Sequence, residues 1–252
     1  MTIRSLSFVK ENLQGKKTEM IKYDQHFMID EELIKRIVSY LDIQQNESVI
    51  EIGAGNGALS SELYTKTKNL NLVEIDKELI SGLKEKFKDV KILNKNVLNM
   101  ELKYDKIVGN IPYNISEPLF NKLLKSNFKK AIFTVPNNFL ISPLLNKLMN
   151  TFFKIETLEI VDKDKFKPKP RVLSKVISVE HKKLNDNERI LKEVYINQTK
   201  KLMNAFEDAY FHVLKLSKKQ TKEKIPAFEF LEKRVYMLNT KEMSKIVEFL
   251  NI

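Results

Sequence analysis

The sequence predicts an α/β fold in which helices cover both faces of a mainly parallel sheet, followed by a small all-helical domain. An apolar run at 48–52 leads directly into a glycine-rich turn and a helical segment, which is the opening of a nucleotide-binding βαβ unit. Strands and helices then alternate, as is typical of a Rossmann-like sheet. From about residue 184 onward, apolar residues recur mainly at helical spacing. We therefore expect an α/β domain over 1–183, with an N-terminal arm over 1–22, and a helical domain over 184–252.

The strands of the first domain are predicted from short apolar runs. The expected strands cover 48–52, 71–75, 90–93, 106–109 and 130–135, and a late strand pair covers 156–161 and 172–179. Helical segments at 58–64 and 77–87 connect the first three strands. Because parallel neighbours need a crossover connection, this alternation predicts a mainly parallel sheet.

The second domain is predicted from apolar residues at helical spacing. The expected elements are a helical segment over 188–216, a polar loop over 217–224 and short helices over 227–238 and 240–250. Asn239 and Glu242 have the spacing of a capping box, which would begin the last helix. Three aromatic residues, Phe206, Tyr210 and Phe211, are expected in the core of this domain.

The composition excludes several classes of protein. With 252 residues and no cysteine, the chain has no disulfide, cysteine-ligated metal or cysteine nucleophile. No run approaches the ~20 apolar residues that a membrane-spanning helix needs. The histidines lack metal-ligand spacing, so no metal site is predicted. We expect a reducing, cytoplasmic compartment.

Charge gives the first positive indication of a partner. The chain carries 44 basic and 33 acidic side chains, for a net charge of +11, and residues 151–252 carry 22 and 15 of them. Such an excess suits a polyanion with phosphates to be neutralised, although a solvated lysine-rich surface is an equal alternative. The densest run supplies five candidate phosphate contacts: Lys163, Lys165, Lys167, Lys169 and Arg171.

The glycine turn predicts a cofactor site. Gly53, Gly55 and Ala58 satisfy the relaxed dinucleotide pattern G-x-G-x-x-A, and glycines let a ligand approach the backbone closely. Glu74 lies near the end of the next strand, 21 residues after Gly53, where a carboxylate can accept hydrogen bonds from both ribose hydroxyls. This pair favours a cofactor that contains adenosine, but it does not distinguish NAD from S-adenosylmethionine.

The segment 110–113, Asn-Ile-Pro-Tyr, follows the fourth strand and suggests the chemistry. The exocyclic amine of a base is a weak nucleophile because its lone pair is delocalised into the ring. The Asn110 side-chain oxygen and the Ile111 carbonyl can each accept one of its N–H bonds. Pro112 would stiffen the turn, and Tyr113 could stack on a flipped or single-stranded base. Such a site works by positioning and electrostatics.

These motifs together resemble those of the rRNA adenine dimethyltransferase family, which contains the KsgA-type enzymes, with their archaeal relatives, and the Erm resistance methyltransferases. The resemblance runs from about residue 23 to the C-terminus. The stretches that carry it in the first domain are Tyr23–Asp30, Val49–Gly57, Val73–Asp76, Gly109–Ser116 and Phe166–Val172. In the second domain, Asn197–Ala205 and Glu232–Asn239 resemble the KsgA type, and the latter particularly its archaeal form.

The resemblance implies a function for both domains. The first would be a Rossmann-like methyltransferase domain that binds S-adenosylmethionine, and the second would bind RNA. A monomer would N6-methylate, and by expectation dimethylate, two adjacent adenosines in the 3′-terminal hairpin of small-subunit rRNA during ribosome biogenesis. The implied cofactor contacts are Gln25, His26, Met28, Gly53, Gly55, Glu74, Asn96 and Asn110. The implied catalytic residues are Asn110, Ile111, Pro112 and Tyr113, with Tyr113 and Phe166 beside the target base.

The chain departs from the family pattern in two places. Asn96 stands where the family usually has an aspartate that accepts a hydrogen bond from the cofactor's adenine amine. An asparagine can still accept through its oxygen, but it adds an NH₂ group that needs its own partner, so we expect weaker cofactor binding. The segment Val135–Leu140 replaces a family segment that carries charge, which affects the details of RNA recognition.

Three alternatives remain open at this stage. An Erm-like enzyme would methylate large-subunit rRNA, although the C-terminal segments argue against it. A catalytically degenerate RNA-binding assembly factor is motivated by Asn96 and Val135–Leu140, and it is opposed by the intact Asn110 motif and Glu74. An NAD-dependent oxidoreductase would explain the glycine turn alone.

Overall fold

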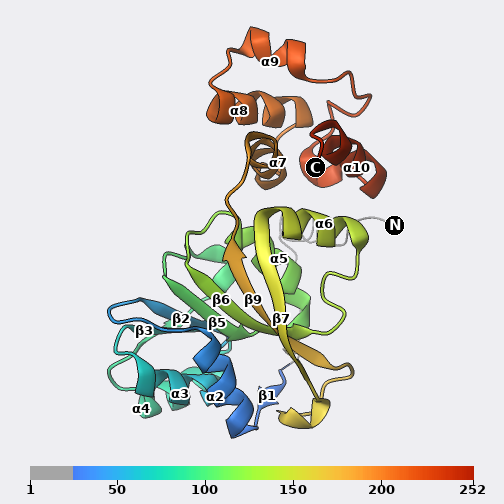
Figure 1. The fold of residues 1–252 in the computed structure, drawn as a ribbon. Coiled ribbons are helices and arrows are strands. Elements are labelled where there is room, and N and C mark those ends of the chain that lie inside the picture. Colours follow the sequence, from blue (N-terminus) through green and yellow to red (C-terminus); the bar gives the residue numbers. More distant parts are fainter. Residues whose placement is uncertain (1–24) are drawn as a thin grey trace. The chain divides into compact units, whose positions relative to one another are not determined.

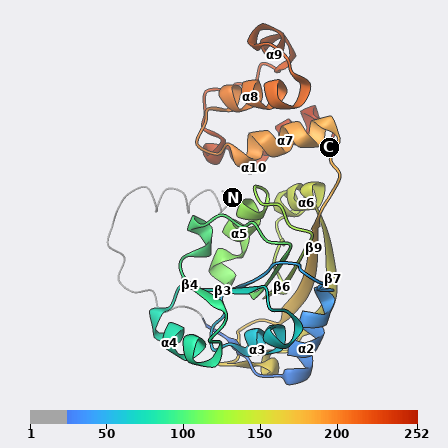
Figure 2. The ribbon, with the colours of Figure 1, turned by 90° about the vertical axis from the view of Figure 1, so that its left-hand side faces the viewer.

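The computed structural model describes residues 25–252, so the predicted N-terminal arm lies outside the described residues. The described chain forms two units, which Figures 1 and 2 show as ribbons. A sheet unit contains the residues up to Ile141 together with Phe153–His181, and a helical unit contains Ser142–Phe152 and Lys182–Ile252. The segment Ser142–Phe152 therefore groups with the helical unit, whereas the pattern of the sequence assigned it to the first domain.

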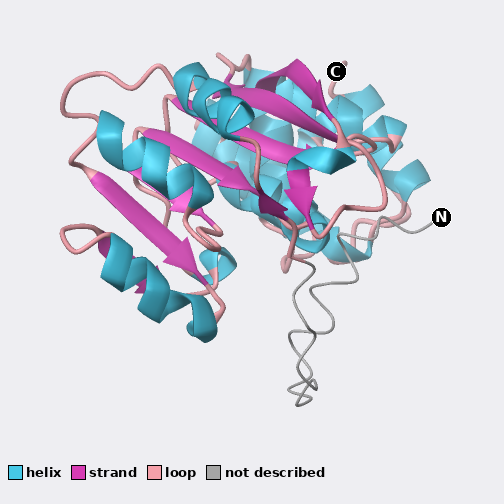
Figure 3. Cartoon of the chain, turned by 90° about the horizontal axis from the view of Figure 1, so that it is seen from below, coloured by secondary structure: helices cyan, strands magenta, loops and turns pink. Residues whose placement is uncertain are grey.

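The sheet unit is built on seven strands in the order β4-β3-β2-β5-β6-β9-β7. The strands, drawn as magenta arrows in Figure 3, are β2 (Val49–Ile52), β3 (Leu70–Glu74), β4 (Lys91–Asn94), β5 (Lys106–Asn110), β6 (Lys130–Pro136), β7 (Phe153–Val161) and β9 (Ser174–His181). The first five strands in this order are parallel, and β9 runs antiparallel to both of its neighbours, β6 and β7. Every predicted strand is present, with ends that differ by a few residues.

Helices lie on both faces of this sheet, as predicted. Figures 1 and 2 show α2, α3 and α4 on one face and α5 on the other. Their bounds are α2 (Glu31–Tyr40), α3 (Ala58–Lys66), α4 (Lys77–Lys86) and α5 (Ser116–Leu123), with 3₁₀ turns η1 (Val97–Asn99), η2 (Tyr113–Ile115) and η3 (Lys163–Lys165). Helix α2 was not predicted from the sequence; it begins where the Asp30 side chain accepts a hydrogen bond from the Leu33 amide.

The core explains why the central strands read as continuous apolar runs. All four residues of β2 are buried, as are the first four of β5, because helices cover both faces. Leu33 and Ile37 of α2 pack in the same cluster as Val49 and Val108. A buried sheet of this kind places the carboxyl ends of β2, β3 and β5 at one edge, where ligands of open α/β sheets bind.

The helical unit has five α-helices within the described residues. They are α6 (Pro143–Phe152), α7 (Asp186–Ile196), α8 (Leu202–Leu214), α9 (Lys218–Lys224) and α10 (Thr240–Phe249), with a 3₁₀ turn η4 at Val235–Met237. The predicted capping box of Asn239 and Glu242 begins α10. Phe206 and Tyr210 are buried as expected, but Phe211 is 58% exposed, so its core assignment was wrong.

Two predictions for this unit were also wrong. The polar stretch 217–224 is helical, because Ser217 and Gln220 form a second capping box. The stretch 227–238 is largely non-helical despite its apolar spacing. Its backbone is engaged elsewhere: the Lys233 carbonyl accepts from the Leu202 amide at 2.8 Å, and the Val235 amide donates to the Lys200 carbonyl at 3.0 Å. Within residues 25–252, no helix has both the length and the apolar character needed to cross a membrane.

Candidate active site

The glycine turn is anchored to the neighbouring strand. The amides of Gly53 and Ala54 both donate to the Val73 carbonyl, at 2.8 and 3.1 Å. Gly53 and Gly55 have φ angles of +71° and +57°, which glycine adopts without strain. A Cβ added at Gly55 would also lie 3.2 Å from the Phe27 ring. Any residue with a Cβ is therefore disfavoured at position 55, both by the backbone conformation and by the lack of space.

Glu74 holds the turn and the end of β3 together. One of its carboxylate oxygens accepts from the Gly55 amide at 2.8 Å, and the other accepts from the Asp76 amide at 2.9 Å. The side chain is 4% exposed. An ionised carboxylate has about four acceptor positions, so two hydrogen bonds orient it and leave capacity for ribose hydroxyls. The next residue, Ile75, is 40% exposed. This exposed apolar residue was not expected from the sequence, where Ile75 formed the end of the predicted strand 71–75.

A second carboxyl group, that of Glu51 on β2, is buried two residues before Gly53. It is 1% exposed, and the Ser60 hydroxyl donates to it at 2.5 Å. Burial raises the pKa of Glu51 from its ordinary value of 4.5 to about 8. The folded protein therefore keeps a proton that the unfolded chain loses above pH 4.5.

This difference predicts that stability falls as pH rises. Between about pH 5 and 8 the folded state binds more protons at Glu51, so the free energy of unfolding should decrease, by up to about 4 kcal/mol from this group. Glu51→Gln removes the titrating group and should flatten the dependence. Urea unfolding of both proteins without cofactor at pH 6, 7 and 8 measures it. Parallel pH profiles would contradict the prediction.

Two of the stretches that carry the family resemblance, residues 25–30 and Phe166–Val172, are brought together. Strands β1 (Phe27–Met28) and β8 (Phe166–Lys167) form a two-stranded antiparallel sheet. His26 Nδ1 lies 2.8 Å from the Pro168 carbonyl oxygen, and the Ile29 amide donates to the Lys165 carbonyl at 2.9 Å. Two segments far apart in the sequence thus form one structural element beside the glycine turn.

Asn110, at the end of β5, is fixed by this element. Its side-chain nitrogen donates to the His26 carbonyl at 2.7 Å. This bond engages the amide NH₂ and leaves the side-chain oxygen as the acceptor. The Ile111 amide donates to the Thr134 carbonyl of β6 at 3.0 Å, which sets the start of the following turn. Pro112 precedes η2. The Tyr113 side chain lies outside what the structure describes, so its predicted stacking stays a prediction.

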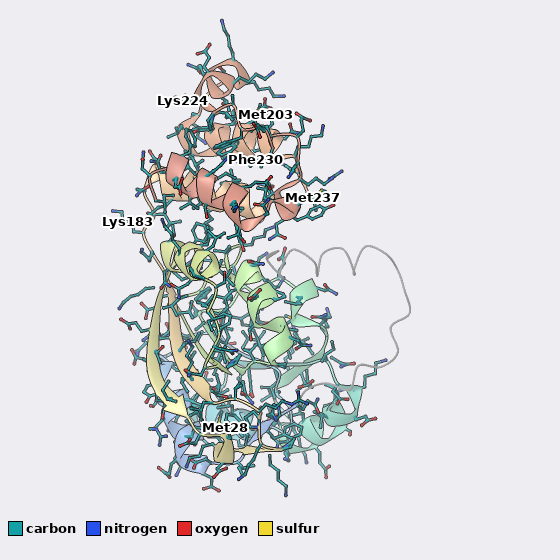
Figure 4. The ribbon with its side chains drawn as sticks, turned by 90° about the vertical axis from the view of Figure 1, so that its right-hand side faces the viewer. Met28, Lys183, Met203, Lys224, Phe230 and Met237 are labelled. Atoms are coloured by element: carbon teal, nitrogen blue, oxygen red, sulfur yellow. The ribbon has the colours of Figure 1, made fainter. Side chains whose placement is uncertain are left out.

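The other predicted cofactor and base residues differ in their surroundings. The Gln25 amide donates to Asp76 at 3.2 Å, which places it at the end of β3. Met28, labelled in Figure 4, is 3% exposed and lies in the core. Phe166 is 2% exposed and belongs to the same core cluster. A ring enclosed in this way has no open face, so the structure does not support its predicted stacking on the base; Phe166 instead anchors β8.

Asn96 caps the 3₁₀ turn η1. Its side-chain oxygen accepts from the Leu98 amide at 2.9 Å. That bond takes one of the two lone pairs of the oxygen, and the NH₂ nitrogen beside it only donates. The predicted hydrogen bond from the cofactor to the Asn96 oxygen would therefore compete with this cap.

The predicted RNA-binding run is largely occupied by contacts within the protein. Lys165 pairs with Asp30, Lys169 pairs with Asp164 at 2.5 Å, and Lys163 donates to the Arg171 carbonyl at 2.6 Å. The remaining side chains, those of Lys167 and Arg171, are exposed. The structure therefore reduces the number of free cations in this run.

Two solved structures share the fold. A dimethyladenosine transferase from Plasmodium falciparum has a TM-score of 0.60 at 21% identity, covering 90% of this chain and 98% of that one. The 23S rRNA methyltransferase ErmE also has a TM-score of 0.60, at 19% identity, covering 90% of this chain and 100% of that one. The equal scores confirm the methyltransferase fold without choosing between the two branches.

Sequence comparison is more specific. The chain matches the family described as ribosomal RNA adenine dimethylase over residues 16–251. A ribosomal RNA small subunit methyltransferase A from Malacoplasma penetrans is 36% identical over 71% of each chain. A protein of the same name from Borreliella burgdorferi is 30% identical across 98% of this chain and 94% of that one. The chain therefore belongs to the ribosomal RNA adenine dimethylase family and is an rRNA adenine methyltransferase.

Proposed function

We propose that this enzyme uses S-adenosylmethionine to methylate N6 of two adjacent adenosines in the 3′-terminal hairpin of small-subunit rRNA, during ribosome assembly in the cytoplasm. The relatives named as small-subunit methyltransferases cover 71% and 98% of the chain, and they support this branch over the Erm-like alternative. The addition of two methyl groups to each base and action as a monomer are parts of the same proposal.

The residues of the turn fit the cofactor. Among the described residues, and apart from the two chain neighbours of Gly53, one atom lies within 4 Å of a Cβ built there, the Asn110 backbone oxygen at 3.8 Å, so the described chain leaves space against the backbone here. Glu74 would hold the ribose hydroxyls, and Gly53 and Gly55 would allow close approach. The exposed Ile75 offers an apolar surface beside that carboxylate. When bound, S-adenosylmethionine supplies an activated methyl group on a sulfonium.

Asn110 would position the base. Its oxygen accepts one N–H of the adenine amine, and the Ile111 carbonyl accepts the other, which directs the nitrogen lone pair out of the ring plane. As the amine becomes tetrahedral its N–H groups grow more acidic, so both hydrogen bonds strengthen in the transition state. The proton then leaves to water. The observation that carries this proposal is the Asn110–His26 hydrogen bond, which fixes the orientation of the amide.

The test is transfer of labelled methyl groups to ribosomal particles that lack the modification. We expect incorporation into small-subunit particles and N6,N6-dimethyladenosine among the released nucleosides, mapped to the 3′-terminal hairpin. Transfer to large-subunit RNA alone would establish the Erm-like alternative. Absence of both transfer and cofactor binding would establish the degenerate RNA-binding factor.

Cofactor affinity should rise when Asn96 is replaced by aspartate. A carboxylate can cap the Leu98 amide with one oxygen and accept from the adenine amine with the other, whereas Asn96 offers a donor at the second position. We expect Asn96→Asp to lower the Kd for S-adenosylmethionine by about 3- to 10-fold, roughly one hydrogen bond. Calorimetric titration measures it. Asn99→Asp, at an exposed position of the same turn, controls for the added charge; equal gains in both variants would contradict the argument.

A further inference from the structure

The segment that fixes Asn110 is itself held by few backbone contacts. The Asn110 side-chain nitrogen donates to the carbonyl of His26, the residue immediately before β1. Strand β1 consists of Phe27 and Met28, and its partner β8 is equally short. A ladder of two residue pairs supplies few hydrogen bonds and would be marginally stable alone. The orientation of the Asn110 amide therefore depends on what else holds β1 in place.

Part of β1 is held by its side chains and by its N-terminal neighbour. The Met28 side chain is buried in the core, and the Phe27 ring lies so close to the glycine turn that a Cβ added at Gly55 would be 3.2 Å from it. His26 Nδ1 lies 2.8 Å from the Pro168 carbonyl oxygen. These contacts place β1 on the core and on the turn, and they leave its C-terminal end to be fixed by the residues that follow it.

Lys165 contacts that C-terminal end with both its backbone and its side chain. It is the last residue of the 3₁₀ turn η3 and directly precedes β8, and Figure 1 shows β1 beside the yellow segment that contains both. The Lys165 carbonyl accepts from the Ile29 amide at 2.9 Å, and its ammonium group pairs with the Asp30 carboxylate. Its own amide donates to the Asp162 carbonyl at 3.2 Å, just after β7. One residue thus joins the segment after β7 to the two residues that follow β1.

Asp30 connects this contact to helix α2. One of its carboxylate oxygens accepts from the Leu33 amide at the start of the helix, and the other faces Lys165. The hydrogen bonds from Lys165 and from the Leu33 amide lower the pKa of Asp30 from its ordinary value of 3.8, so the carboxylate is ionised at neutral pH. Both side chains are partly exposed, so water screens the pair and its contribution to overall stability is small. Its importance lies in joining β1, α2 and the start of β8 at one point.

We propose that Lys165 and Asp30 are positioning residues for methyl transfer, and that their ion pair acts on the target base through β1 and Asn110. This inference rests on the proposed function, in which the Asn110 oxygen accepts an N–H of the adenine amine. The path runs from the pair through the Ile29 backbone contact into β1, and from there to the His26 carbonyl and the Asn110 amide. A group misplaced by about 1 Å can cost about 10²-fold in rate, so a small movement of β1 would slow the chemical step.

The geometry favours this role over the phosphate contact that the sequence predicts for Lys165. A cation that contacts RNA must leave or share its ion pair, whereas Lys165 is engaged through its ammonium group, its amide and its carbonyl. Lys167, two residues further on, is exposed and remains the better candidate for a phosphate. The two roles differ in what they change: a positioning residue changes the maximal rate, and a phosphate contact changes the affinity for the substrate.

The experiment measures single-turnover methyl transfer by the full chain to small-subunit particles that lack the modification, at saturating S-adenosylmethionine. Lys165→Met keeps a long side chain without its charge, and we expect a maximal rate about 5- to 20-fold below wild type with the half-saturating particle concentration within about 3-fold. Asp30→Asn should slow transfer similarly while keeping the cap of α2, because asparagine caps helices as well as aspartate. Lys165→Arg retains the charge and should restore the rate to within about 3-fold of wild type.

Two comparisons show whether the pair acts through Asn110. Lys35→Met is the matched control, because Lys35 pairs with Glu32 at 2.8 Å within α2, and its rate should stay within about 2-fold of wild type. In an Asn110→Ala background, Lys165→Met should lower the rate by less than about 2-fold further, because the residue through which the pair acts is already lost. A full additional loss in that background, or an equal loss in the control, would overturn the proposal. A raised half-saturating concentration at an unchanged maximal rate would overturn it in favour of a phosphate contact.

A spectroscopic readout separates this proposal from the function on which it rests. The nuclear magnetic resonance signals of the Asn110 side-chain NH₂ depend on its hydrogen bond, and they are assigned by their loss in Asn110→Ala. Lys165→Met should shift them, and Lys35→Met should not. Unshifted signals in Lys165→Met would overturn the positioning role. Shifted signals in a protein whose wild type transfers no methyl group to small-subunit particles would support the link to Asn110 and refute the proposed function.

Discussion

Replacement of Asn110 by alanine is expected to lower kcat for methyl transfer by about 10²- to 10³-fold, the range seen when one preorganised hydrogen-bonding group is removed from a transition state. The side-chain oxygen is the acceptor that directs the adenine lone pair, and alanine offers no substitute. The same change removes the bond to the His26 carbonyl. Because the bond is to a backbone carbonyl and the substitution leaves the glycine turn and Glu74 unchanged, the Kd for S-adenosylmethionine should change by less than about 10-fold. Single-turnover transfer to unmethylated small-subunit particles measures the rate.

Asn114→Ala provides the matched control for this experiment. Asn114 is exposed and four positions further along the same loop, so its removal should leave kcat within about 2-fold of wild type. Equal rates for wild type and Asn110→Ala would show that the amide does not serve the chemical step. A loss of cofactor affinity as large as the loss of rate would instead assign Asn110 to cofactor binding alone.

The part of the site that could be predicted from sequence consists of local signals at strand ends. Gly53, Glu74 and Asn110 each follow a short apolar run, and parallel strands bring their carboxyl ends to one edge. What escaped prediction depends on contacts between distant segments. The pairing of β1 with β8 buries Phe166, and no local pattern around that residue distinguishes an anchor from a stacking ring.

Two stretches of the helical unit also could not be predicted from local sequence, one that is helical and one that is not. Residues 217–224 look like a loop because a helix that buries only Thr221 leaves the rest of its surface polar, and the Ser217–Gln220 capping box was the signal that could have found it. Residues 227–238 have apolar spacing that suits a helix. Their backbone groups instead bond to the start of α8, and these long-range hydrogen bonds override local propensity.

The largest effect of a single substitution on stability is expected one residue before Asn110. Gly109 lies in β5 between β2 and β6, and a Cβ added there would be 2.5 Å from the Ile52 carbonyl oxygen and 2.7 Å from Ile111 Cδ1. The Ile52 carbonyl belongs to the strand that leads into the glycine turn, so it cannot move without displacing the cofactor site. Gly109→Ala should therefore lower the free energy of unfolding by about 3 kcal/mol or more, a large share of a typical total.

Gly82→Ala tests whether this loss comes from the clash or from the general replacement of glycine. Gly82 is in α4, and among residues 25–252 no heavy atom beyond the adjacent residues and the nearby helix backbone lies within 4 Å of an added Cβ. Alanine there should raise the free energy of unfolding by about 0.5 to 1 kcal/mol, because it restricts the unfolded chain and favours the helix. If the sheet is packed as described, urea unfolding should show a lower free energy of unfolding for Gly109→Ala and a higher one for Gly82→Ala, relative to wild type. A Gly109→Ala protein whose free energy of unfolding stays within about 1 kcal/mol of wild type would contradict this prediction. It would mean that β2 and β5 can separate, and that the glycine turn and the motif beginning at Asn110 can move apart with them.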